Sequence, residues 1–198
     1  KEEPLFDTAA AIFVLSRDDI HRSGATSIPE ALRLVPGVQV ARLGASRWAV
    51  SARGFNDRFA QKLLVLIDGR SVYSAQFSGV NWEIRDAVLE DIDRIEVIRG
   101  PGATLWGANA LNGIINIVTK SSRNTQGGLL TGGGGTKERG FGTFRYGSSF
   151  GDQGFYRFYG KVSLRDEFVD TSGNPTQDEW QSVRTGFRVD REMQAGNF

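Results

Sequence analysis

The chain has 198 residues, and 24 lysines and arginines against 23 aspartates and glutamates leave a formal net charge of +1. Basic residues are scattered among acidic ones, which argues against a nucleic-acid partner, because such proteins gather positive charge on one face. Cysteine is absent and His21 is the only histidine, so disulfides, sulfur-based zinc sites and histidine-rich catalytic centres lack their building blocks. We therefore predict no catalytic residues, no metal site and no cofactor.

The sequence contains no candidate for a membrane-spanning helix. Its longest clean aliphatic run, residues 63–67, is far shorter than the roughly 20 residues that such a helix needs. Residues 1–4 lack the charged start and apolar stretch of a signal peptide. We therefore expect a mature chain from which any export signal has been removed.

Two short amphipathic helices are predicted near the start. Ser16 with Asp19 forms a capping-box pattern for a helix that ends at Gly24, and Ser27 with Glu30 repeats that pattern for a second helix. The second helix is expected to end before the Pro-Gly pair at 36–37. Its apolar face comprises Ile28, Ala31, Leu32 and Val35.

Strand signals fill the rest of the first half, up to about Ser122. Asp68-Gly69 is a hairpin turn signal before a short strand at 71–73. Mixed helix and strand signals of this kind predict a compact α+β domain. The other predicted strands are residues 12–15, 38–41, 48–53, 63–67, 92–99 and 114–119.

After Ser122 the sequence becomes Gly-rich, aromatic and alternating, with residues 127–135 as the expected boundary. In residues 156–165 the even positions are mostly apolar and the odd positions mostly polar, and 144–150 and 183–189 alternate similarly. The pattern predicts antiparallel strands of roughly ten residues, long enough to cross a membrane when tilted.

Two interpretations of this alternation remain open. One is a soluble sheet with a single face on a core. The other is an unfinished membrane barrel, since about four strands are present and a closed barrel needs at least about eight. In the second case apolar faces and unpaired edges would lack partners, so we expect residues 139–191 to be disordered or paired with another copy of the chain.

The glycine-rich segment 99–107 does not fit a nucleotide site. Ala108 and Asn109 stand where a phosphate-binding loop needs lysine and Ser/Thr, and Leu105 stands where a dinucleotide fingerprint needs its third glycine. A tight structural turn explains these glycines better.

The acidic residues are expected to be solvated at helix ends and strand edges. Negative charge in a first helical turn is favourable without any chemistry, and His21 is expected to be a polar residue on a surface helix. The carboxylates considered are Asp18, Asp19, Glu90, Asp91 and Asp93.

Residues 73–82 combine large aromatic side chains with polar neighbours and have no helix or strand period. Such a loop suggests a binding surface. The alternative, of equal weight, is that Tyr73, Phe77 and Trp82 fold back onto the core of their own domain.

The sequence of residues 92–107, IDRIEVIRGPGATLWG, continued by GIINIVTK at 113–120, closely resembles the end of the plug domain in TonB-dependent receptors. The resemblance extends back through LVLIDGR at 64–70, SARGF at 51–55 and the helix at 28–35. It implies an α+β fold, in which a small mixed-sheet plug domain with short helices (residues 1–122) precedes antiparallel β-strands of an incomplete outer-membrane barrel (residues 123–198).

In that family the plug lies inside a barrel of roughly 22 strands, which is embedded in the lipid of the cell outer membrane. TonB pulls on an N-terminal box that faces the periplasm. Residues 1–10 contain no convincing box, so the TonB contact is expected upstream of Lys1. Arg53 and Arg99 resemble the plug arginines that pair with barrel glutamates, and with partners beyond Phe198 we expect them to be bare or differently paired.

The function implied by the resemblance is TonB-dependent active uptake of a scarce nutrient complex, most often a ferric siderophore, with cobalamin or another complex as an alternative. A receptor that reports ligand occupancy to a sigma-regulator, or a soluble α+β enzyme, are the other candidates. The plug apex should contact the extracellular ligand through aromatic rings and hydrogen-bond donors, without ligating its metal. The expected apex residues are Leu43, Arg47, Trp48, Tyr73, Gln76, Phe77, Asn81 and Trp82.

Overall fold

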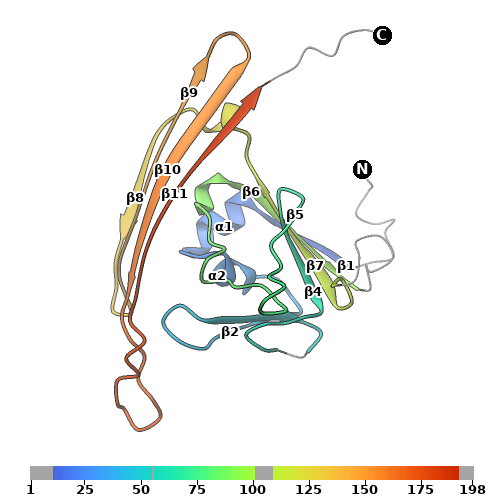
Figure 1. Cartoon of the computed structure of the whole chain (residues 1–198), viewed down its shortest axis with the longest axis vertical. Helices are drawn as coiled ribbons and strands as arrows, with labels where there is room; N and C mark the ends of the chain where they lie inside the picture. The colour runs from blue at the N-terminus through green and yellow to red at the C-terminus, as the bar shows by residue number, and fades with distance from the viewer. Residues whose placement is uncertain (1–10, 55, 101–108, 192–198) are drawn as a thin grey trace. The chain divides into compact units, whose positions relative to one another are not determined.

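The computed structural model describes residues 11–54, 56–100 and 109–191. Contacts between its residues divide the chain into two compact units, Lys1–Thr119 and Lys120–Phe198 (Figure 1). Among the described residues, no helix is long and apolar enough to cross a membrane.

The first unit is built on a five-stranded mixed sheet of order β1-β6-β7-β4-β5. All neighbouring strands are antiparallel except β4 and β7, which run parallel. A separate antiparallel hairpin consists of β2 (Val38–Arg42) and β3 (Trp48–Ala52). The sheet strands are β1 (Ala11–Ser16), β4 (Leu63–Ile67), β5 (Arg70–Ser71), β6 (Ile92–Arg99), which follows the 3-10 helix η1 (Leu89–Asp91), and β7 (Gly113–Thr119).

The two helices have similar starting sequences but different caps. At α1 (Arg17–Ser23) the capping box is formed, because Ser16 Oγ accepts from the Asp19 amide and Asp19 accepts from the Ser16 amide. At α2 (Ile28–Leu32) it is not.

There the Ser27 hydroxyl is buried without a hydrogen-bond partner, and the Glu30 carboxylate accepts instead from the amide and hydroxyl of Thr26. The predicted second capping box is therefore wrong. The carboxylate of Glu30 reaches one residue further back than the pattern implies.

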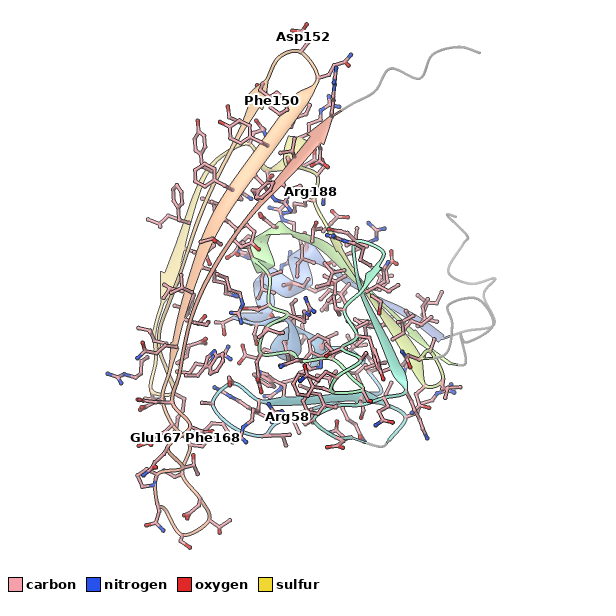
Figure 2. The ribbon with its side chains drawn as sticks, viewed as in Figure 1. Arg58, Phe150, Asp152, Glu167, Phe168 and Arg188 are labelled. Atoms are coloured by element: carbon pink, nitrogen blue, oxygen red, sulfur yellow. The ribbon has the colours of Figure 1, made fainter. Side chains whose placement is uncertain are left out.

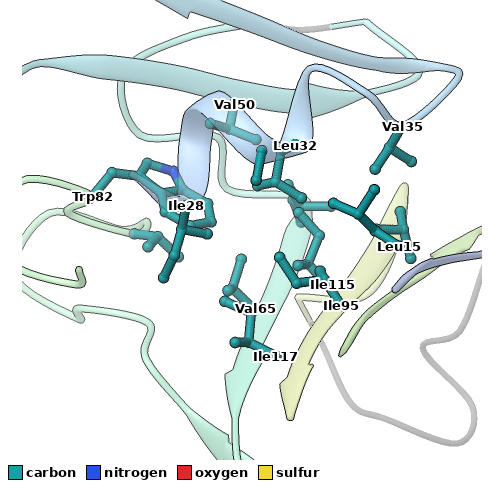
Figure 3. Close-up of a cluster of buried hydrophobic side chains, with 14 of the residues drawn as sticks. Leu15, Ile28, Leu32, Val35, Val50, Val65, Trp82, Ile95, Ile115 and Ile117 are labelled. Carbon is teal, nitrogen blue, oxygen red and sulfur yellow. The ribbon is translucent and has the colours of Figure 1, made fainter. Parts of the chain in front are cut away.

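The core of the first unit lies between the sheet, α2 and β3. Figure 3 shows Ile28 and Leu32 of α2 grouped with Val50, Val65 and Ile115 from three strands. The four residues of the predicted apolar face are at most 2% exposed, but the helix ends at Leu32, earlier than predicted, so Val35 is buried beyond its end. This core explains why a helix as short as α2 forms, since tertiary packing supplies the stability that five residues lack alone.

The Asp68-Gly69 turn is confirmed. Asp68 has φ 48° and Gly69 φ 75°, the paired left-handed conformations of a tight hairpin turn. The Asp68 carboxylate also accepts from the amide and hydroxyl of Thr119, at 2.8 and 2.7 Å. The turn is thereby fastened to the end of β7.

The second unit is a four-stranded antiparallel sheet of order β11-β10-β9-β8. Residues 127–135 are not a boundary, because β8 occupies most of them, and most of residues 139–191 lie in regular strands rather than in a disordered segment. In β10 and β11 every residue is paired, from Gly154 with Arg191 to Arg165 with Trp180. The strands are β8 (Gly127–Gly133), β9 (Glu138–Phe150), β10 (Gly154–Arg165) and β11 (Trp180–Arg191).

This sheet exposes its apolar face. Val183 is 77% exposed and Phe187 82% exposed on β11, and Phe144 and Phe158 are exposed on the two preceding strands. On the opposite face Arg165 is buried and pairs with Glu138. This polarity is the reverse of that expected for a soluble sheet with a core, so the barrel interpretation is supported.

The two ends of the sheet differ in their connections. Phe150 and Asp152 lie at the end with the short β9–β10 turn, and Glu167 and Phe168 lie at the other end, where the long β10–β11 loop begins (Figure 2). Lys137 Nζ, from the turn between β8 and β9, donates to the Glu167 carbonyl and lies 6.0 Å from the Phe168 ring centroid. The loop is therefore tied to the neighbouring β8–β9 turn.

The chain enters this sheet through the 3-10 helix η2 (Ser122–Thr125), which is buried against the polar face. The Ser122 amide donates to Asp190 of β11 at 2.6 Å. Arg157 of β10 donates to the Lys120 carbonyl and to the Thr125 hydroxyl. We refer to Ser122, Thr125, Arg157 and Asp190 as the linker clasp.

Candidate functional site

The hairpin loop between β2 and β3 places two of the expected apex residues at the surface. Leu43 is 48% exposed and Arg47 is exposed, while the Leu43 amide donates to the Arg47 carbonyl at 2.8 Å. The Arg42 guanidinium donates to the carbonyls of Gly44 and Ala45 inside the loop. The loop is therefore closed by one backbone hydrogen bond and by the Arg42 side chain.

Trp48 has a packing role rather than a surface role. It is 3% exposed, and the guanidiniums of Arg33 and Arg42 lie 5.5 and 5.3 Å from its ring centroid. The expectation that this ring contacts ligand is not met by its position. The strand at Trp48 was predicted, but the sequence did not indicate that all residues of β3 are buried, Trp48 included.

Residues 74–79 form a closed turn at the surface. Ser74 and Gly79 exchange two backbone hydrogen bonds, of 2.8 and 3.3 Å, and Ser78 has φ 52°. Gln76 and Phe77 between them are exposed, Phe77 to 43%. This turn therefore presents an aromatic ring and an amide side by side in the sequence to solvent. We call residues 74–79 the aromatic turn.

The other residues expected in this loop point elsewhere. Trp82 is 5% exposed and lies in the core beside Ile28 (Figure 3). Asn81 is half-buried, and its side-chain oxygen accepts from the Glu83 amide. Tyr73 is also half-buried. Trp82 thus folds into the core, as the second interpretation expected, whereas Phe77 stays exposed, and its role in binding stays a prediction.

Phe59 and Arg58 belong to this surface and were missed by the sequence analysis. The Phe59 and Phe77 rings are stacked, with centroids 5.2 Å apart and planes 10° from parallel. A side chain at Gly79 would place its Cβ 2.8 Å from Phe59, so glycine permits this close approach. Residues 56–61 also place an aromatic side chain in a polar loop, which is the pattern that marked residues 73–82 as a candidate binding surface. The same signal could have identified Phe59.

A pocket of about 450 Å³ adjoins the same ring. This volume is in the range of small-molecule sites. Phe59 is both a wall of the pocket and the partner of Phe77, which makes the pocket and the aromatic turn neighbours. The other lining residues are Ser51, Ala52, Gly54, Asn56, Asp57, Ala60, Gln61, Lys62, Leu63 and Asn112.

The carboxylates do not form a site in the part of the chain that the structure describes. No group of three or more His, Cys, Asp or Glu residues is placed to hold a metal ion there. Asp19 caps α1 and Asp93 pairs with Arg94. Asp91 is buried, so its expected solvated position is wrong. It is the last residue of η1, directly before β6.

The two arginines expected to hold the plug both donate hydrogen bonds to backbone carbonyls. Arg53 is exposed with φ 57°, and its guanidinium donates to the Arg99 carbonyl at 3.4 Å. Arg99 donates to the Pro36 carbonyl at 2.9 Å, and its Nε is buried without a partner. Within residues 11–54, 56–100 and 109–191, neither arginine is paired with a carboxylate, so both charges lack a counter-ion there.

Comparisons with known proteins identify the family of the chain. The family described as TonB-dependent Receptor Plug Domain matches residues 4–114. The chain is 31% identical over 191 residues to the vitamin B12 transporter BtuB of Vibrio vulnificus, covering 94% of this chain and 29% of that protein. It is 34% identical over 174 residues to BtuB of Photobacterium profundum, covering 85% and 27%.

The fold also resembles that of the ferric yersiniabactin uptake receptor FyuA from Yersinia pestis. The TM-score is 0.69 at 19% sequence identity, over 91% of this chain and 28% of that chain. The chain thus spans less than a third of the length of these relatives. Because the plug description matches more than half of its 198 residues, the chain belongs to the TonB-dependent receptor family and contains its plug domain.

Proposed function

We propose that the chain is the plug, with a boundary close to Ser122, and the first barrel strands of an outer-membrane receptor that imports a scarce, bulky nutrient complex. The observation that carries this proposal is the outward apolar face of β9, β10 and β11 in the same chain as a plug fold. Lipid is the solvent that suits such a face, while water or another protein suits the opposite, polar face.

The aromatic turn and Phe59 are the proposed plug contribution to ligand binding. Phe77 offers flat apolar area, and Gln76 next to it offers an amide donor. Arg47 and Leu43 on the β2–β3 loop are proposed as further contacts. A chelated metal needs no protein ligand, so recognition of the outside of the chelate by such groups is sufficient.

For the ligand we propose a metal chelate, with a ferric siderophore as the first candidate. A cobalamin is the second, and it is favoured by relatives at 31% and 34% identity that are named vitamin B12 transporters. Both are large, rigid complexes with apolar faces and peripheral oxygen or amide groups. The exposed aromatic and amide groups on the plug suit either.

The same proposal covers the partners and the location. TonB is expected to act through a segment upstream of Lys1, with energy from the inner membrane. Arg53 and Arg99 are proposed to pair with carboxylates of the barrel, which their lack of carboxylate partners among the described residues supports. Removing one partner of such a pair inside a lumen would leave the other charge desolvated, which costs more than the roughly 0–1 kcal/mol that an exposed ion pair contributes.

The test is uptake by the complete receptor in its own cells. A deletion strain should lose uptake of either radiolabelled ferric siderophore or cyanocobalamin, and uptake should also stop when the proton gradient is collapsed. Phe77→Ala should weaken binding, whereas Leu34→Ala, at a similarly exposed apolar residue (45%), should not. Unchanged uptake of every chelate in the deletion strain would contradict the proposal.

A further inference from the structure

Two irregular loops of the first unit are joined by an ion pair. Arg58 lies on the loop between β3 and β4 and is labelled in Figure 2, and Glu83 follows the aromatic turn. Arg58 Nη2 and Glu83 Oε1 are 2.7 Å apart. The Arg58 side chain is 38% exposed and the Glu83 side chain only 12%. The pair therefore sits at the edge of the interior, where water screens it less than at an open surface.

The ion pair is continuous with the aromatic stack. The Arg58 guanidinium carbon lies 5.0 Å from the centroid of the adjacent Phe59 ring, within the range of a cation–π contact. Phe59 in turn stacks on Phe77 and approaches the backbone of Gly79. The Phe59 ring thus meets a cation and a second ring, while the Phe59 backbone and Cβ lie against Gly79 of the turn. Its position depends on contacts from both loops.

The local backbone supports the same arrangement at each end. The Arg58 amide donates to the Asp57 side chain at 2.7 Å, and the Glu83 amide donates to Asn81 at 3.2 Å. A hydrogen bond within its own loop therefore fixes the backbone of each charged residue. Breaking the pair would remove the guanidinium from a carboxylate that is only 12% exposed, where an opposite charge matters more than at an open surface.

We propose that Arg58 and Glu83 are positioning residues that hold the Phe59–Phe77 stack in the arrangement that ligand meets. This inference rests on the proposed function, because it assigns the pair a role at that same ligand surface. Loops that are already ordered lose less conformational freedom when ligand binds, so fixing them raises affinity without adding any contact. The ion pair itself need not touch the ligand.

The experiment uses the complete receptor in detergent, with ferric enterobactin and cyanocobalamin as probes in equilibrium titrations. Glu83→Gln and Arg58→Gln should each weaken binding by about 3- to 30-fold. The exchanged pair Arg58→Glu/Glu83→Arg should recover part of the loss. In a Phe77→Ala background the same substitutions should have no further effect, because the stack that the pair positions is gone.

The matched control is Glu96→Gln, which breaks the Arg94–Glu96 pair of the same 2.7 Å length on β6 and should leave affinity unchanged. Hydrogen exchange at the Ser74 and Gly79 amides gives a second readout, and it should accelerate in Glu83→Gln and Arg58→Gln but not in Glu96→Gln. If the wild-type receptor binds neither probe, the proposed function fails and this inference with it. If it binds but Glu83→Gln has wild-type affinity, or its loss is the same with and without Phe77, the positioning role alone is wrong.

Discussion

The two units of the chain bury opposite kinds of side chain. In the first unit Ile28, Ile95 and Ile115 are fully buried, and the exposed positions are mostly polar. In the second unit Phe187 and Val183 are among the most exposed side chains, whereas Arg157 is buried under η2. The first pattern is typical of a domain that buries an apolar core away from water, and the second is typical of a sheet whose apolar face contacts lipid.

This difference shows that alternation fixes the two faces of a strand without fixing which face is inside. Residues 156–165 alternate cleanly, but their sequence fits either a soluble sheet or a barrel wall. The solvent around the sheet decides, and the first two of five predictions test this contrast directly.

The largest effect is expected in the first core. Ile115→Ala removes a fully buried side chain from β7 and should lower the free energy of unfolding by about 2–5 kcal/mol. Urea denaturation followed by tryptophan fluorescence would measure it, since Trp48 and Trp82 are buried in the same core. Val183→Ala on the exposed face of β11 is the control. An equal loss in both variants would erase the contrast between the units.

A charge on the apolar face of β11 tests its solvent. Phe187→Lys should destabilise the receptor in bilayers by about 2–4 kcal/mol if the residue lies near the bilayer midplane. Ser182→Lys, on the other face of the same strand, should have a much smaller effect. Folding titrations of the complete receptor in lipid vesicles would compare them. Equal tolerance of the two lysines would contradict a lipid-facing surface.

The linker clasp offers a smaller test inside the second unit. Asp190→Ala leaves the buried Ser122 amide without its acceptor, at a cost of about 1–3 kcal/mol. Hydrogen exchange at Ser122 should accelerate accordingly. Asp152→Ala, on the exposed β9–β10 turn, should change nothing. Unaltered protection of Ser122 in Asp190→Ala would show that the clasp does not hold the linker.

The smallest effect compares the two helix caps of the first unit. Ser16→Ala should cost about 1 kcal/mol, because it removes a formed capping box. Ser27→Ala should be close to neutral, because the Ser27 hydroxyl is buried without a partner and does not cap α2. Thermal unfolding of both variants would measure the difference. Equal costs would mean that Ser27 does cap its helix in solution.

The pH dependence of the first cap has a defined sign. Hydrogen bonds from the Ser16 hydroxyl and amide lower the pKa of Asp19 below its ordinary value. Because this pKa is lowered, ionised Asp19 stabilises the fold fully above its unfolded-state pKa of about 3.9. This stabilisation is lost as the pH falls through its folded-state pKa. The cost of Ser16→Ala should therefore shrink below about pH 4.

Much of the fold follows from short-range sequence signals. The capping box at Ser16, the Asp68-Gly69 turn and the apolar face of α2 each depend on residues a few positions apart, and each was correctly predicted. The family resemblance likewise comes from contiguous segments, and the plug match at residues 4–114 confirms it. Local propensity and periodicity indicate such features, although tertiary packing is still needed to stabilise a helix as short as α2.

Other features were decided only by tertiary structure. Phe77 and Trp82 lie in one loop of similar composition, but the core accepted Trp82 and left Phe77 on Phe59. The Arg58–Glu83 pair spans 25 residues and the Ser122–Asp190 bond spans 68. The sequence by itself determined most of the elements, the Asp68-Gly69 turn and the family. Burial and long-range pairing depend on what other parts of the chain bring to the same place, and no local pattern records that.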